Sequence, residues 1–163
     1  MKIHHRMQPC LWFEGQAEEA VAFYTGIFPN SKVINTLTTS AEVAQQSGNP
    51  EGSVLCIEFE LDGQPYLALN GGPQFKFTEA ISLMVRCQDQ QEIDHYWHHL
   101  GAGGPQQAQM CGWLKDKYGV SWQIVPANLT DMMQDAEGYG RMMVALMGMR
   151  KLNIAELEKA FHG

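Results

Sequence analysis

The sequence has little positive charge. It contains 11 Lys and Arg against 18 Asp and Glu, a formal net charge of −7, and it has no basic run. Binding to a phosphate backbone depends on clustered Lys and Arg, so we expect no nucleic-acid partner. No apolar run approaches the roughly 20 residues that span a bilayer, which predicts no membrane partner. Residues 1–8 are polar and no apolar signal block follows them, so we expect a cytoplasmic protein.

Paired cysteines are also missing. Cys10, Cys56, Cys87 and Cys111 are far apart, and none forms a CxxC pair. Each lies in or beside an apolar run, where a thiol packs as a small hydrophobic side chain. We therefore expect four free thiols in a reducing compartment.

Hydrophobic patterning, by contrast, is strong in the first half of the chain. Hydrophobic residues make up 45% of the sequence, which is enough for a core. The patterns predict a strand, a helix and three more strands at residues 9–13, 16–28, 32–39, 53–61 and 64–70. Asp62-Gly63 is a hairpin signal between the last two strands. Residues 40–52 have loop composition, with a short helix as the alternative for the first part of that stretch.

The pattern restarts after Gly71-Gly72-Pro73. A strand at residues 80–86 precedes a helix with Asp89 and Glu92 as a capping box, and residues 106–115 and 120–125 read as a hairpin. A shift of 73 residues places Leu11 on Met84 and the first helix on the second. We therefore predict one domain, 1–163, with modules at 1–73 and 78–126 and a helical tail at 127–163. Within the tail, residues 136–140 look like a break.

Four blocks carry a resemblance to a known family. They are LWFEGQAEEA at residues 11–20, EFELDG at 58–63, ALNGGP at 68–73 and CGWLKDKYGVSWQ at 111–123. They resemble the PhnB-like family of the vicinal-oxygen-chelate superfamily, which also contains glyoxalase I, extradiol dioxygenases and bleomycin-resistance proteins. The resemblance implies an α+β fold. In it, paired βαβββ modules form a curved mixed sheet with helices on its outer face, and C-terminal helices follow.

Such sequences often carry a 3-demethylubiquinone methyltransferase label, and the residues do not favour that reaction. A methyl-donor nucleotide fold needs a Gly-rich turn between a strand and a helix. The dense Gly cluster at 101–104 instead follows a predicted helix and precedes a predicted strand. We therefore consider methyltransferase activity unsupported, and the sequence assigns no catalytic residue.

The resemblance also indicates where a metal site would lie. Metal-using members place two ligands, commonly His and Glu, on the inward strand faces of each module. Those places fall here on Pro9, near Ala80 or Ser82, within residues 68–70, and on Gln123. None holds a His or a clear carboxylate, although divalent catalytic sites favour such ligands. We therefore expect no metal and no cofactor.

Two other sets of residues offer alternatives for a metal. Glu79 is close to the second-module strand and is the acid that could substitute for a missing ligand. His95 and His99 stand at i and i+4, a spacing that can bind zinc. The apolar stripe of the same helix turns them away from the sheet, so we interpret them as a solvated face.

The leading hypothesis is a protein that binds a small organic molecule in the cup of its sheet, because aromatic rings and amides suit a flat organic ligand. The candidate cup-lining residues are Trp12, Asn70, Glu79, Cys111, Trp113 and Gln123. By alternation Gln123 faces the cup and Trp122 packs against a helix. The alternatives are a metal-dependent lyase, isomerase or dioxygenase with displaced ligands, and a structural or interaction module whose cup is filled by side chains.

The methionine-rich tail predicts a homodimer. Met142, Leu146 and Met149 make one helical stripe, and Met143 and Met147 make a neighbouring one. So wide an apolar face is hard to bury on one small sheet, and flexible thioethers suit an adaptable contact surface. The alternative is a tail that folds back onto its own module.

Overall fold

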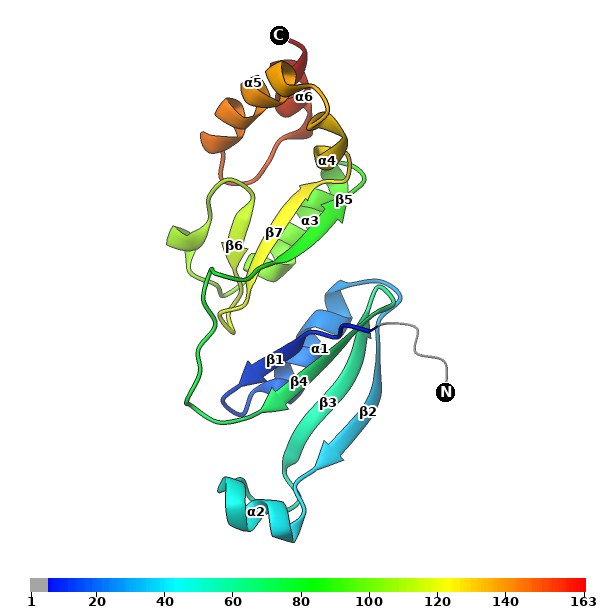
Figure 1. Ribbon diagram of the computed structural model, residues 1–163, viewed down its shortest axis with the longest axis vertical. Helices are drawn as coiled ribbons and strands as arrows, with labels where there is room; N and C mark the ends of the chain where they lie inside the picture. The colour runs from blue at the N-terminus through cyan, green and yellow to red at the C-terminus, as the bar shows by residue number, and fades with distance from the viewer. Residues whose placement is uncertain (1–5) are drawn as a thin grey trace. The chain divides into compact units, whose positions relative to one another are not determined.

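The computed structural model describes residues 6–163 and divides into two compact units, Met1–Lys76 and Phe77–Gly163 (Figure 1). The first five residues, which carry part of the signal-peptide expectation, lie outside the described range. Among the described residues, no helix combines the length and apolar character needed to cross a membrane. Each unit has a small mixed sheet with a helix packed on it, which confirms the α+β class.

The first unit has the strand and helix order that the sequence predicts. Its elements are β1 (Cys10–Phe13), α1 (Ala17–Ile27), β2 (Lys32–Thr38), α2 (Ala41–Ser47), β3 (Val54–Leu61) and β4 (Gln64–Asn70). The sheet order is β1-β4-β3-β2, with β1 parallel to β4 and the other pairs antiparallel. The stretch predicted as a loop contains α2, which Ser40 caps by accepting from the Val43 N–H.

The hairpin between β3 and β4 follows directly from the sequence. Asp62 and Gly63 have φ angles of 47° and 77°. A two-residue type I′ turn needs positive φ at both central positions, and Asp and Gly tolerate it. The apolar stripe of α1 packs on this sheet: Ala17, Ala20 and Tyr24 are fully buried.

The second unit has the three strands that the sequence pattern predicts, one fewer than the βαβββ module that the resemblance implies. Its sheet contains β5 (Leu83–Cys87), β6 (Trp113–Lys115) and β7 (Ser121–Pro126) in the order β5-β7-β6, with α3 (Gln90–Gly101) packed on it. The predicted strand at residues 106–115 is mostly wrong: a 3₁₀ turn occupies Gln106–Ala108, and only three residues pair as β6. Cys111 and Gly112 have φ angles of 53° and 81°, which interrupt an extended strand.

The internal repeat is offset by one residue in its strand. Leu11 is buried toward α1, whereas Met84, its partner under a shift of 73, is 47% exposed. Side chains alternate along a strand, so a slip of one residue moves each side chain to the other face. The residues of β5 on the helix side are therefore Leu83, Val85 and Cys87, of which Leu83 pairs with the buried Trp122 and Cys87 is itself buried.

The tail forms α4 (Leu129–Met132), α5 (Ala136–Met147) and α6 (Ile154–His162). The break predicted at residues 136–140 is wrong, because α5 begins there with Asp135 as its cap. Gly138 is needed for packing: a Cβ on it would lie 2.9 Å from the Phe161 ring of α6. The small residues that suggested a break thus allow two helices to approach closely.

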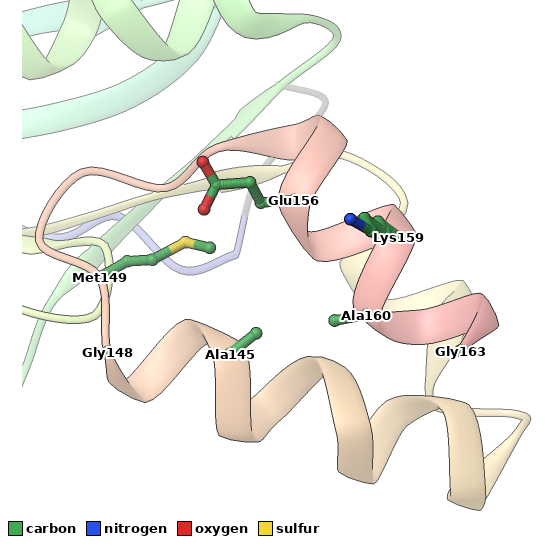
Figure 2. A pocket seen from close by; sticks show the side chains of 7 residues that line it. All are labelled: Ala145, Gly148, Met149, Glu156, Lys159, Ala160 and Gly163. Atoms are coloured by element: carbon green, nitrogen blue, oxygen red, sulfur yellow. The ribbon is translucent and has the colours of Figure 1, made fainter.

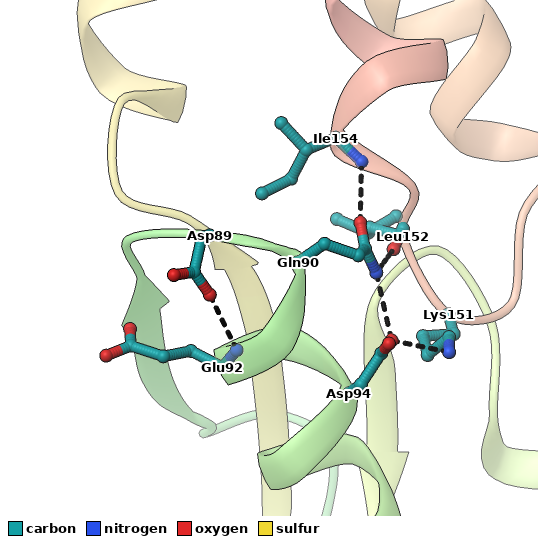
Figure 3. A network of polar contacts seen from close by, with 7 residues as sticks. All are labelled: Asp89, Gln90, Glu92, Asp94, Lys151, Leu152 and Ile154. Carbon is teal, nitrogen blue, oxygen red and sulfur yellow. Dashed lines mark hydrogen bonds and ion pairs between the residues drawn. The ribbon is translucent and has the colours of Figure 1, made fainter.

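A polar network ties α6 to the start of α3 (Figure 3). The Gln90 amide donates to the Leu152 carbonyl (3.1 Å) and accepts from the Ile154 N–H (3.0 Å). Lys151 lies 2.5 Å from Asp94, and the hydrogen bond from Lys151 lowers the pKa of that carboxyl. The same helix end carries the predicted capping box, in which Asp89 accepts from the Glu92 N–H at 2.9 Å.

Candidate functional site

Each sheet has one face packed by its helix and one that is partly open. In the first sheet, Phe13 and Phe59 are buried on the helix side. Trp12, Leu69 and Cys56 alternate with them and form a cross-strand row on the open side. This row is apolar and half-buried, whereas Glu58 and Glu60 follow Cys56 on the same face of β3.

The open face of the second sheet carries an amide beside apolar side chains. Trp122 and Leu114 pair across β7 and β6 and are buried on the helix side. Gln123 lies on the opposite face, as alternation predicts, in a row with Met84 on β5 and Trp113 on β6. An amide, a thioether and an indole ring thus stand side by side.

A neutral hydrogen bond lies at two of the places where the resemblance put metal ligands. The Gln123 Nε2 donates to the Ser82 Oγ over 2.7 Å. An amide and a hydroxyl already bonded to each other do not make a donor set for a divalent cation, which favours His nitrogen or carboxylate oxygen. Among residues 6–163, no group of three or more His, Cys, Asp and Glu side chains could hold a metal.

Glu79, the proposed substitute ligand, is engaged elsewhere. Its carboxylate lies 2.6 Å from the Lys115 Nζ, and this hydrogen bond is the main reason why the pKa of Glu79 is lowered. Lys115 is on the open face, two residues beyond Trp113, and pairs across the sheet with Ser121. The acid and the base come from the linker and from β6.

The side chain of Trp12 is fixed by the last residues of the first unit. Its Nε1 donates to the Gly72 carbonyl (2.8 Å), and Phe75 meets its ring edge-on with centroids 4.9 Å apart. A Cβ on Gly71 would lie 2.3 Å from the ring, so the indole rests directly on this glycine. The ring is therefore fixed by the segment that follows β4.

Asn70 is not on the open face, contrary to expectation. It is 8% exposed, its Oδ1 accepts from the Ala17 N–H (3.0 Å), and its Nδ2 donates to the Val54 carbonyl (3.0 Å). Its place two residues after the buried Ala68 puts it on the helix side. The amide thus satisfies the first N–H of α1, and β-strand periodicity would have indicated its face but not this partner.

Cys111 is also placed differently from the expectation. It lies in the positive-φ turn before β6, not on a strand. Its N–H donates to the Met149 carbonyl (2.8 Å), and its thiol donates to the Met147 carbonyl (3.6 Å). The residue therefore fastens the end of α5 to the turn before β6 within the second unit.

The histidine pair lies on the exposed side of α3. His95 and His99 are exposed, and the His99 Nδ1 is 2.7 Å from the His95 carbonyl. A hollow of about 550 Å³ lies between α5 and α6 of the second unit (Figure 2). Ala145 and Ala160 face it, and the Glu156 and Lys159 side chains stand at its border.

The sequence reasoning missed several residues of the second open face. Arg86, Lys115 and Ser121 were not singled out as site residues, and Met84 was considered only in the repeat. Once Gln123 is assigned to this face, alternation assigns Ser121, and the register assigns the others. The expected strand of ten residues at 106–115 obscured that register.

Comparison with known proteins identifies a matching family model and similar solved structures. A family model described as 3-demethylubiquinone-9 3-methyltransferase matches residues 5–125. No curated protein matches the chain. The solved structure of a PhnB protein from Bacillus cereus is 34% identical, with a TM-score of 0.65, and the match covers 74% of this chain and 99% of that one.

Two fosfomycin resistance proteins, both FosX, share the fold at low identity. The one from Mesorhizobium loti is 12% identical with a TM-score of 0.56, and the match covers 82% of this chain and all of that one. The one from Listeria monocytogenes, complexed with Mn(II) and sulfate, is 15% identical with a TM-score of 0.52, covering 82% and 98%.

Proposed function

The chain belongs to the 3-demethylubiquinone-9 3-methyltransferase family, as a PhnB-like member of the vicinal-oxygen-chelate superfamily, and on this premise we propose that it binds a small organic molecule on an open sheet face without a metal. The family name refers to methyl transfer. In this chain the Gly-rich segment 101–104 ends α3 and does not start a helix, unlike a nucleotide-binding turn. We therefore favour binding over methyl transfer.

The row of Met84, Gln123 and Trp113 is the observation that carries this proposal. All three are on the open face of the second sheet, and Met84 is 47% exposed. An indole and a thioether offer a flat organic molecule apolar contact, and the amide can orient it by hydrogen bonding. The partial exposure of these side chains favours a surface open to a ligand over a face filled from within.

The site needs no metal under this proposal. Ser82 and Gln123 hold each other through a neutral hydrogen bond, and Glu79 is paired with Lys115. A metal-dependent reaction on this face would have to break both interactions. Metal analysis of protein purified without a His tag tests this part: stoichiometric zinc, iron, manganese or nickel would contradict it.

A ligand-screen thermal shift tests binding itself. We expect some flat aromatic compounds to raise the Tm of the wild-type protein, and we expect Trp113→Ala to lose that shift. Phe75→Ala removes an aromatic ring that is 65% exposed in the linker and serves as the matched control, with the shift retained. A screen in which no apolar or aromatic compound stabilises the protein would overturn the proposal.

A further inference from the structure

The open face of the second sheet carries positive charge in an acidic protein. β5 places Arg86 on this face and β6 places Lys115 there, whereas the three strands together contain no Asp or Glu. The whole chain has a formal net charge of −7. A cationic face with no acid of its own on a negatively charged chain attracts anions locally.

Lys115 is the more buried of these two cations. Its side chain is 22% exposed, and its counterion is the Glu79 carboxylate, whose side chain is 64% exposed. Glu79 comes from the linker before β5 and not from the sheet. Exposed ion pairs contribute little to stability, so exchange of this carboxylate for that of a ligand costs little and leaves the ammonium with an anionic partner.

The Ser121 hydroxyl is an independent indication that this face lacks a hydrogen-bond partner. Ser121 is 3% exposed and pairs across the sheet with Lys115, and its Oγ has no hydrogen-bond partner among the described residues. A buried hydroxyl without a partner is costly, and such a group needs an explanation. Lys115 is the cross-strand partner of Ser121 on the same face, so an acceptor oxygen bound to Lys115 could approach this hydroxyl and accept a hydrogen bond from it.

We propose that the ligand of this face is an organic carboxylate, which replaces Glu79 on the Lys115 ammonium, accepts a hydrogen bond from the Ser121 hydroxyl and lays its flat body against Trp113. This inference rests on the proposed binding function and specifies its ligand class. The ion pair of Glu79 and Lys115 shows that this ammonium can bind a carboxylate, because the two groups lie 2.6 Å apart. Gln123 and Ser82 are next along the face and can bind a second polar group of the ligand.

Titration with a matched pair of probes tests the inference. Benzoate and benzamide have the same ring and differ in charge. We expect wild-type protein to bind benzoate about tenfold more tightly than benzamide, because a charge-assisted hydrogen bond is stronger than a neutral one. Lys115→Gln should remove the preference, and Glu79→Gln, which removes the internal competitor at an exposed position, should strengthen benzoate binding.

Lys151→Gln is the matched control, since it removes a lysine paired with Asp94 on α3 at a distance of 2.5 Å. It should leave both affinities unchanged. Equal binding of the two probes, or no response of benzoate binding to Glu79→Gln, would overturn the carboxylate inference and leave the binding function standing. Failure of both probes together with the entire aromatic screen would overturn the binding function as well.

Discussion

The Gln123 side chain donates a hydrogen bond from its Nε2 to the Ser82 Oγ across 2.7 Å, joining β7 to the residue just before β5. The resemblance predicts metal ligands at Gln123 and near Ser82 or Ala80. The pair is neutral, half-buried and mutually satisfied. It therefore ties the segment before the edge strand β5 to the central strand β7.

This pair predicts a measurable coupling energy. Ser82→Ala and Gln123→Ala should each destabilise the protein slightly, and the double variant should lose less than the sum. We expect a coupling of about 0.5 to 1.5 kcal/mol, the usual net value of one hydrogen bond. Urea unfolding of the four proteins measures it. Strictly additive losses would show that the bond is not formed in solution.

Two glycines of α5 should respond oppositely to the same substitution. A Cβ on Gly138 would lie 2.8 Å from the Asp135 Oδ2 and 2.9 Å from the Phe161 ring, whereas a Cβ on Gly140 would meet nothing within 4 Å. We expect Gly138→Ala to destabilise by about 1 to 3 kcal/mol through overpacking. Gly140→Ala should stabilise by about 1 kcal/mol through helix propensity. Thermal unfolding of the two variants measures these changes. Stabilisation by both substitutions would contradict the α5–α6 contact.

The Cys87 thiol should make stability fall at alkaline pH. Burial, with added repulsion from Glu92 and Asp89, raises its pKa from 9.0 to about 12. Between these values the unfolded chain has released the proton and the folded chain retains it, so the free energy of unfolding decreases as pH rises. Cys87→Ala should have a shallower alkaline slope than wild type in urea unfolding at pH 8 to 11. Identical slopes would exclude this thiol as the cause.

The homodimer remains a prediction, on a narrower surface than the sequence indicated. Met142 and Leu146 are buried, and α5 packs on α6, so one methionine stripe is covered within the chain. Val144 and Met147 stay 74% and 68% exposed. We expect light scattering to give twice the single-chain mass of 18.3 kDa.

A charge on that surface should dissociate the dimer. Met147→Glu should reduce the mass to that of one chain, because a buried unpaired carboxylate is costly at an apolar interface. Met110→Glu, at a residue that is 60% exposed outside the tail, should leave the dimer intact. A wild-type mass of 18.3 kDa at micromolar concentration would contradict the prediction.

The sequence by itself determined the local structure of this protein. Asp62-Gly63 specified a turn because its residues tolerate positive φ, and Asp89 with Glu92 specified the start of α3 through its free N–H groups. Alternation was enough to set Trp122 and Gln123 on opposite faces, and it would have placed Asn70 too had the strand been followed to its end. These features depend on neighbours within a few residues.

Only the tertiary structure decided which distant groups meet. Glu79 and Lys115 are 2.6 Å apart, and Cys111 bonds to the end of α5, because chain segments with no shared pattern come together. Gly138 by itself predicts a helix break, whereas the Phe161 ring packed against it explains why a glycine is needed there. Hydrophobic periodicity records which side of an element is buried but not what covers it, so the members of a site drawn from several segments depend on packing.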